Sequence, residues 1–175
     1  MLETLLWDCF EAPNRCEADG LSAAIRTVPS NTVVLAFRLD GQAFRVASGI
    51  EKGVCCDRLL LALQKSPDKE SRLTLFLLEM KGRNHDHAVD QLAATLDALR
   101  TKLRENLSES SLKRTEFIAV IVSDRAQVSA SRTADEKEFR RKYRAKLYTL
   151  PGQRARHEQR APSVDLSDLL RSASM

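Results

Sequence analysis

Short apolar runs separated by polar turns dominate the hydrophobic pattern of this chain. Residues 59–63, 73–80 and 117–122 are almost entirely apolar, and each run is bounded by charged or turn-forming residues. Runs of this length are typical of β-strands that are buried on both faces. Only the polar stretch 65–71 separates the first two runs, so the sequence predicts that they pair in antiparallel fashion at the centre of a sheet.

Two segments have the spacing of amphipathic helices. From residue 87 to about residue 105, apolar side chains recur every three or four positions and form one stripe. A second helix is predicted over residues 135–148, where Phe139, Tyr143 and Leu147 lie four positions apart and many other positions carry Lys or Arg. We expect the first helix to cover one face of the sheet.

The N-terminal third is expected to add a helix and a hairpin. The helix is predicted over residues 17–28, ending before Pro29. Residues 32–39 and 42–47 are predicted to be strands joined at Asp40-Gly41, a dipeptide typical of two-residue hairpin turns. Together with the runs above, this order predicts an α/β fold with a mixed central sheet.

The length of 175 residues, 43% of them hydrophobic, suits a single domain with a real core. We expect that domain to occupy residues 1–148, with its core over about residues 15–123 and a basic helix over 135–148. Residues 149–175 contain few apolar side chains until Leu166, Leu169 and Leu170, and are predicted to form a flexible C-terminal tail with one short helical turn.

The positive charge is concentrated in one segment. The formal net charge of the chain is only +4, but residues 132–160 hold ten basic and four acidic residues. That segment is therefore +6 and the rest of the chain is −2. A local basic block suggests an anionic partner, nucleic acid first and a membrane surface second. The alternative is a solubilising helix and tail.

The sequence offers neither a membrane span nor a signal peptide. Its longest uncharged run, residues 27–37, is too short to span a bilayer, and the apolar N-terminal residues are interrupted by Glu3 and Asp8. The four cysteines form no Cys-x-x-Cys pair and could make two disulfides in a secreted protein. Because no secretion signal is recognised, we expect reduced thiols in a cytoplasmic protein.

Three ionisable residues lie where the pattern is otherwise apolar. Asp57 precedes the first buried strand, while Glu79 and Lys81 end its partner and, two positions apart, share one face of it. If Asp57 lies across from Glu79, two carboxylates meet on that face. Carboxylate pairs repel unless a cation joins them, and Mg²⁺ or Mn²⁺ suits such ligands. The simpler alternative is an ordinary salt bridge between Glu79 and Lys81.

In these segments the chain resembles the PD-(D/E)XK nuclease superfamily, which has the restriction-endonuclease-like fold. The resemblance rests on the sequences of residues 56–61, 76–82 and 87–95. It implies an αβββαβ core in which Asp57 and Glu79 bind metal and Lys81 is the catalytic lysine. It further implies that the Met80 carbonyl is an extra metal ligand and that Gln91, on the following helix, belongs to the catalytic site.

The chain departs from that family pattern at one position, and a second family feature has more than one candidate residue. Thr95 stands where exonuclease-like members often have Tyr, which puts the exonuclease subtype in doubt. Many members also use a glutamate on the first helix, and Glu11, Glu17 and Glu51 are all candidates for it.

The expected function is therefore that of a Mg²⁺- or Mn²⁺-dependent endo- or exonuclease, with DNA as the favoured substrate. The basic helix is expected to contact phosphates through exposed side chains, namely Lys137, Arg140, Arg141 and Arg144. Target choice would come from a homodimer or a partner protein, in a context such as prokaryotic defence, restriction or a mobile element. The alternative is an inactive member of the fold that binds nucleic acid or another protein.

Overall fold

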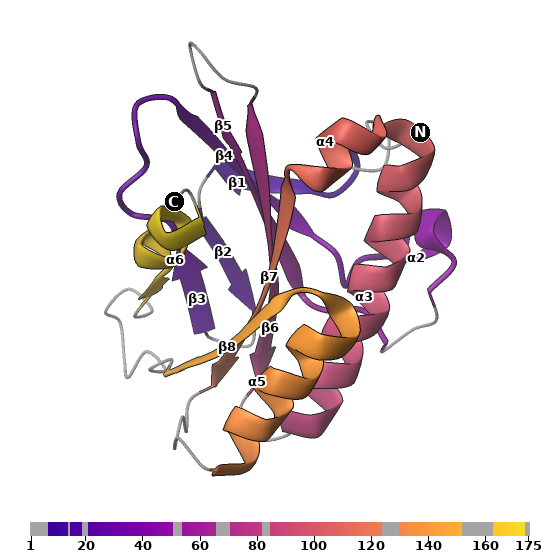
Figure 1. Cartoon of the computed structure of the whole chain (residues 1–175), viewed down its shortest axis with the longest axis vertical. Coiled ribbons are helices and arrows are strands. Elements are labelled where there is room, and N and C mark those ends of the chain that lie inside the picture. The colour runs from indigo at the N-terminus through magenta and orange to yellow at the C-terminus, as the bar shows by residue number, and fades with distance from the viewer. Residues whose placement is uncertain are drawn as a thin grey trace.

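A six-stranded mixed sheet forms the centre of the molecule (Figure 1), with the strand order β1-β4-β5-β6-β7-β8. The computed structural model describes residues 7–13, 15–18, 21–50, 54–65, 71–81, 85–123, 130–151 and 163–173. The sheet consists of β1 (Phe10–Pro13), β4 (Thr32–Arg38), β5 (Arg58–Gln64), β6 (Arg72–Lys81), β7 (Thr115–Ser123) and β8 (Lys146–Pro151). Neighbours from β1 to β6 are antiparallel, whereas β6, β7 and β8 are parallel.

The central strands are buried on both faces because their apolar runs leave no polar face. Leu59, Leu75 and Leu77 point to one side of the sheet and belong to a core cluster that we call the α3-side cluster. The alternate residues, such as Leu60 and Phe76, belong to a second cluster on the opposite side, the β3-side cluster. The predicted antiparallel pair at the centre of the sheet is thus confirmed as β5 and β6.

Helix α3 (His85–Asn106) covers the first of these faces, as expected (Figure 1). Its apolar stripe is buried against the sheet at Ala88, Leu92, Leu96, Leu99 and Leu103. The short helix α4 (Glu109–Lys113) links α3 to β7, and α5 (Ala130–Tyr143) lies beside α3 and links β7 to β8. Strand β7 runs parallel to β6, and the crossover through α3 and α4 supplies the long connection that parallel neighbours need.

A second, smaller sheet covers the other face. It contains β2 (Arg15–Ala18), β3 (Leu21–Ala24) and β9 (Ser163–Asp165), in that order, followed by α6 (Ser167–Ala173). Leu21, Leu166 and Leu170 lie in the β3-side cluster. The chain is therefore a mixed α/β fold with a mixed central sheet and, within the described ranges, five helices.

Two N-terminal predictions are wrong. Residues 17–28 do not form a helix, because β2 and β3 pair as antiparallel strands there. Residues 42–47 are not a strand, because α2 (Gln42–Ser48) follows Gly41 and ends at Gly49, which has a left-handed φ of 73°. Phe44 is the buried residue of this helix. Residues 32–39 contain β4, as predicted.

The C-terminal predictions are partly wrong. The basic helix α5 runs from Ala130 to Tyr143 and does not reach residue 148. Residues 146–148 belong to β8, and Leu147 is a buried residue of that strand. Residues 163–173 are not a free tail, because they form β9 and α6 and pack on the β3-side cluster. Residues 152–162 lie outside the described part. None of the helices in the described ranges is both long and apolar enough to cross a membrane.

Candidate metal and catalytic site

Asp57 and Glu79 meet where β5 begins and β6 ends. Arg58 pairs with Leu78 in the antiparallel register, so Asp57, one residue earlier, lies level with Glu79. Glu79 alternates with Leu78 and Met80 of the β3-side cluster and therefore faces α3. Asp57 lies two positions before Leu59 of the α3-side cluster and is on the same face. Glu79 is completely buried and Asp57 is partly buried. The structure brings the two predicted carboxylates together on one face.

Each carboxylate accepts a hydrogen bond from the opposite strand. The backbone N–H of Asp57 donates to Oε2 of Glu79 over 3.0 Å. The backbone N–H of Met80 donates to Oδ2 of Asp57 over 2.7 Å. These two hydrogen bonds continue the pairing of β5 and β6 by one residue before the start of β5. They hold the two carboxylate side chains next to each other.

The backbone of Met80 points towards Asp57. Its side chain is buried in the β3-side cluster, on the face away from Glu79. Because the N–H and C=O of one strand residue point to the same edge, the N–H bond to Asp57 indicates that the Met80 carbonyl is also directed towards the β5 edge. The Met80 backbone and the Asp57 carboxylate therefore share this strand edge.

Helix α3 holds the segment that leads into Asp57. Nε2 of Gln91 donates to the carbonyl of Cys55 over 3.0 Å, and Gln91 is only 5% exposed. Oγ1 of Thr95 accepts the N–H of Cys56 over 2.9 Å and donates to the carbonyl of Gln91 over 2.8 Å. Gln91 thus contacts the backbone of the segment that leads into Asp57 and positions it there.

The cysteines next to the site are neutral thiols. Burial raises the pKa of Cys55 to about 12, and the nearby carboxylates contribute to that shift. Burial raises the pKa of Cys56 well above its usual value, and Cys55 and Glu79 raise it further. Cys9, Cys55 and Cys56 are all free cysteines, as expected. Their sulfur atoms are also softer ligands than the oxygen donors that Mg²⁺ and Mn²⁺ prefer.

The remaining residues of the predicted site are placed less completely. Lys81 is the last residue of β6 and pairs with Ser123, but its side chain lies outside the described part. Of the three candidate glutamates, Glu11 lies 2.8 Å from Nε of Arg58, whose side chain alternates with Asp57 and faces away from the site. Glu17 is in β2, where its side chain is not described, and Glu51 lies outside the described residues.

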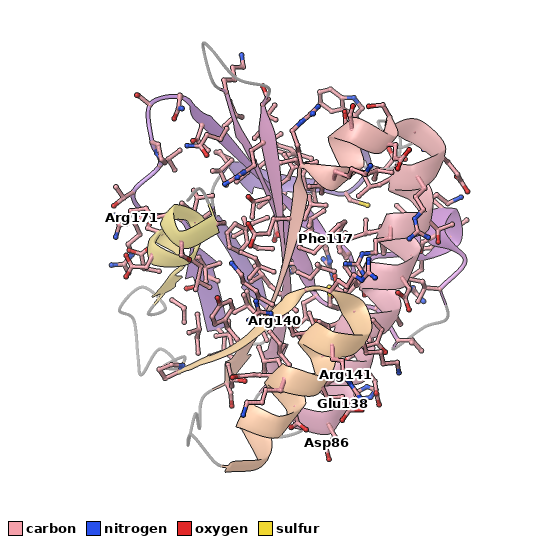
Figure 2. All side chains as sticks on the ribbon, viewed as in Figure 1. Asp86, Phe117, Glu138, Arg140, Arg141 and Arg171 are labelled. Carbon is pink, nitrogen blue, oxygen red and sulfur yellow. The ribbon has the colours of Figure 1, made fainter. Side chains whose placement is uncertain are left out.

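The predicted phosphate contacts lie on the surface of α5 and just beyond it. Lys137, Arg140, Arg141 and Arg144 are all exposed, whereas Phe139 is buried beneath α5. Arg140 and Arg141 extend from the helix at the surface of the molecule (Figure 2). Arg144 follows the end of α5 and is not part of it.

The donor set suits a hard divalent cation. Two carboxylates and a backbone carbonyl are oxygen ligands of the kind that Mg²⁺ and Mn²⁺ prefer. The described residues include no group of three or more His, Cys, Asp or Glu side chains placed to hold a metal. Water or a phosphate oxygen would have to complete the coordination of any ion held by Asp57 and Glu79.

Comparison with known proteins leaves the family open: no family model matches the chain, and no curated protein shows detectable similarity to its sequence.

Sequence reasoning missed the parts of this site that depend on tertiary contact. Thr95 was read only as a departure from a family pattern, yet its hydroxyl connects α3 to Cys56. Arg58 was read only as the start of a strand, yet it is buried and contacts both Asp40 and Glu11. A charged residue next to a buried strand was the available signal, since such groups are seldom buried without a partner.

Proposed function

We propose that the protein is a metal-dependent nuclease of restriction-endonuclease-like fold that hydrolyses phosphodiester bonds in nucleic acid, with DNA as the favoured substrate. One observation carries the proposal, the reciprocal contact of Asp57 and Glu79 at adjoining strand ends. Two carboxylates held this close repel each other, and a divalent cation relieves that repulsion. The rest of the proposal follows from what surrounds the pair.

The arrangement of the elements supports this reading. Three consecutive antiparallel strands, β4, β5 and β6, are followed by α3 and by a parallel β7. This order is similar to the βββαβ part of the family core named above. Helix α2 is an addition between β4 and β5, and the described N-terminal residues form strands where the family has a helix.

In this proposal Asp57, Glu79 and the Met80 carbonyl hold Mg²⁺ or Mn²⁺. The bound ion would lower the pKa of a water molecule and stabilise negative charge on the phosphate. The ammonium of Lys81 would orient the attacking water and balance charge at the phosphate. Gln91 acts through the loop that it holds, because its amide fixes Cys55 two residues before Asp57.

The exposed basic residues on and after α5 would bind the phosphate backbone of the substrate. Contacts of this kind carry no sequence information and weaken steeply with salt. Sequence choice would then require a homodimer or a targeting partner. We place the protein in the cytoplasm, in a defence, restriction or mobile-element context.

The proposal is tested by cleavage assays on plasmid DNA, single-stranded DNA and RNA with Mg²⁺ or Mn²⁺. Lys81→Ala and Glu79→Gln should each abolish cleavage, and EDTA should abolish cleavage by the parent protein. Lys65→Ala is the matched control, because exposed Lys65 lies just beyond the far end of β5. Cleavage by Lys81→Ala at the parent rate would show that the assigned site is wrong.

A second candidate is an inactive relative that binds nucleic acid or protein. It is favoured by the structural use of both carboxylates, each of which already accepts a backbone N–H. Calorimetry with Mn²⁺ separates the candidates. Binding that disappears in Asp57→Asn supports the nuclease, whereas the absence of heat from the parent protein supports the inactive relative.

A further inference from the structure

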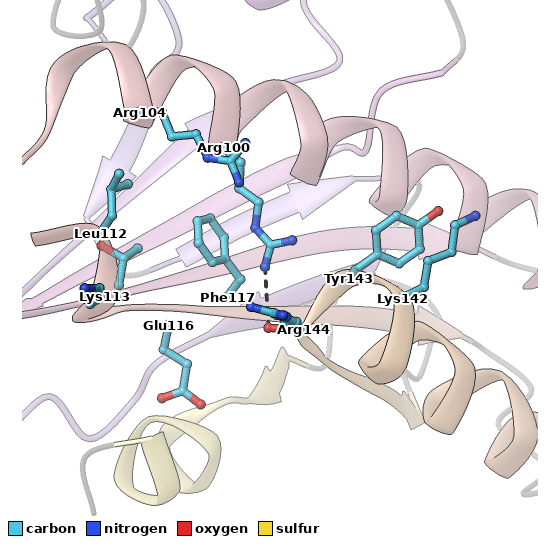
Figure 3. Close-up of a pocket in the computed structure, with 10 residues that line it drawn as sticks. Arg100, Arg104, Leu112, Lys113, Glu116, Phe117, Lys142, Tyr143 and Arg144 are labelled. Atoms are coloured by element: carbon cyan, nitrogen blue, oxygen red, sulfur yellow. Dashed lines mark hydrogen bonds between the residues drawn. The ribbon is translucent and has the colours of Figure 1, made fainter. Parts of the chain in front are cut away.

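A basic cavity lies at the other end of α3 from the carboxylate pair. It has a volume of about 610 Å³ and is lined by the C-terminal half of α3, by α4, by the start of β7 and by the end of α5 (Figure 3). Arg100 lies nine residues after Gln91, which places it roughly 14 Å further along the helix at 1.5 Å per residue. The cavity is therefore distinct from the candidate metal site.

The lining of the cavity is strongly cationic. Five of its side chains are basic, namely Arg100, Arg104, Lys113, Lys142 and Arg144, and one is acidic, Glu116. Oε1 of Glu116 is 2.8 Å from Nζ of Lys146, outside the lining. Figure 3 shows the Glu116 carboxylate pointing away from Arg100. The acidic residue thus does not neutralise the basic side chains around it.

Only one of the five basic side chains has a carboxylate partner within the described part of the chain. Nζ of Lys113 lies 3.0 Å from Oε1 of Glu109, and both side chains are highly exposed at the rim. For Arg100, Arg104 and Arg144 the described residues provide no ion pair. Asp97 lies near enough to act on Arg100 and Lys142 but forms no ion pair with either among the described residues. The basic side chains therefore still repel one another, and a bound anion would relieve that repulsion.

Arg100 is held in place before any ligand arrives. Its guanidinium lies over the ring of Phe117, 4.7 Å from the centroid, and Nη2 donates to the carbonyl of Arg144 over 3.4 Å. Burial lowers the pKa of Arg100, Asp97 opposes that shift, and neighbouring Arg104 and Arg144 add to it. A guanidinium fixed by stacking loses less freedom on forming bidentate bonds to an anion.

Arg144 adds a second fixed feature. Its φ of 48° lies in the left-handed region, where residues other than glycine are strained. This conformation ends α5, and the carbonyl of Arg144 accepts the bond from Arg100. A glycine would satisfy the turn at lower cost, so the backbone conformation alone does not call for an arginine at this position.

We propose that this cavity binds a phosphate-bearing ligand of nucleotide size. A phosphate carries up to two negative charges and several acceptor oxygens, which matches a cluster of arginines better than a single carboxylate does. The cavity volume lies within the range of small-molecule sites. The phosphate can belong to a free nucleotide or to a nucleic-acid strand, and the two sources share this chemistry.

The test is calorimetry on the full chain in EDTA at low salt, which excludes metal-dependent cleavage. The probes are inorganic phosphate, a nucleoside monophosphate and a short single-stranded oligodeoxynucleotide. We expect saturable binding of at least one nucleotide probe and a loss of about tenfold or more in affinity for Arg100→Gln and Arg104→Gln. Equal affinity for the two nucleotide probes identifies a free nucleotide, and preference for the oligonucleotide identifies a strand.

Two further variants make the result specific. Lys102→Gln removes the same charge from α3 but does not line the cavity, so its affinity should stay within about twofold of the parent value. Arg144→Gly should lose affinity without a lower thermal midpoint, because it relieves the left-handed strain. Absence of binding by every probe, or equal losses in Lys102→Gln and Arg100→Gln, would overturn the proposal. Glu79→Gln should bind the probes normally, which separates this result from failure of the nuclease proposal.

Discussion

Glu79 has a structural role that can be separated from a catalytic one. Its Oε2 accepts the Asp57 N–H, and a glutamine at this position keeps an acceptor oxygen there. Glu79→Gln should therefore fold with nearly parental stability while losing metal-dependent cleavage. Glu79→Leu should lose cleavage and also about 1–3 kcal/mol of stability, because it leaves a backbone N–H without its acceptor. Urea unfolding of the two variants checks this difference.

Cys55 should make the protein less stable in alkali. Its pKa is about 12 in the folded chain, against 9.0 for an ordinary thiol. Above pH 9 the unfolded chain therefore releases a proton that the folded chain retains, so stability falls as pH rises from about 9 to 12. The slope attributable to this thiol is about 1 kcal/mol per pH unit.

The measurement is denaturant unfolding at pH 8, 9 and 10, for the parent and for Cys55→Ser. The serine hydroxyl does not titrate in this range and can still donate to the carbonyl of Leu39, which the Cys55 thiol now contacts at 3.3 Å. The parent should lose more stability with pH than this variant does. Parallel pH profiles would contradict the assignment.

Arg144 should limit stability because of its backbone. Glycine adopts the left-handed region without strain, but it also loses more freedom on folding. The net gain expected for Arg144→Gly is about 0.5–1 kcal/mol, seen as a higher thermal midpoint. A lower midpoint would show that the arginine side chain supports the fold.

At the scale of elements, α3 acts as a brace for the segment before Asp57. Thr95→Val should cost about 1–3 kcal/mol, because the buried N–H of Cys56 loses its acceptor. Cleavage should fall with it, since Asp57 follows that residue. Thermal unfolding and initial rates of cleavage measure the two effects.

Thr101→Val is the matched control. Thr101 lies on the same helix and, like Thr95, donates its hydroxyl to the carbonyl four residues earlier, here Asp97 at 3.0 Å. It is exposed, however, and its hydroxyl bond stays within α3. The control should change stability by less than about 0.5 kcal/mol. Equal losses in the two variants would mean that the contact with Cys56 contributes nothing.

The elements that could be predicted were those whose hydrophobic pattern fits only a strand or only a helix. The runs in β5, β6 and β7 and the stripe of α3 were confirmed because burial on one or two faces dictates their spacing. Residues 42–47 were wrongly predicted as a strand, because so short a segment fits the alternation of a strand as well as a short helix that buries only Phe44.

The N-terminal strands were missed for a different reason. Leu21, Ala23 and Ile25 alternate and all lie in the β3-side cluster, a period-two signal that is short and contains an alanine. The carboxylate pair could be predicted because a charge beside an apolar strand is conspicuous. The contacts of Gln91 and Thr95 with the Asp57 loop could not, because they join residues 36–40 positions apart.

At the scale of the whole molecule, the exposed basic residues Lys137, Arg140 and Arg141 lie on α5, outside α3 and the sheet. Arg140→Gln/Arg141→Gln should weaken nucleic-acid binding and reduce the slope of log affinity against log salt by about 2. Fluorescence anisotropy at several salt concentrations measures that slope. Arg171→Gln is the control, because Arg171 is on α6, across the sheet from α5 (Figure 2). An unchanged slope in the double variant would remove α5 from the binding surface.

The late position of β9 and α6 in the chain constrains how the protein folds during synthesis. β9 pairs with β3, some 140 residues earlier, and Leu166 and Leu170 complete the β3-side cluster. Until residues 163–173 are made, Leu60 and Phe76 on that face lack part of their cover. A growing chain therefore exposes an apolar sheet surface while its α3 side can already pack, so chaperone binding should be strongest in the interval before these residues emerge.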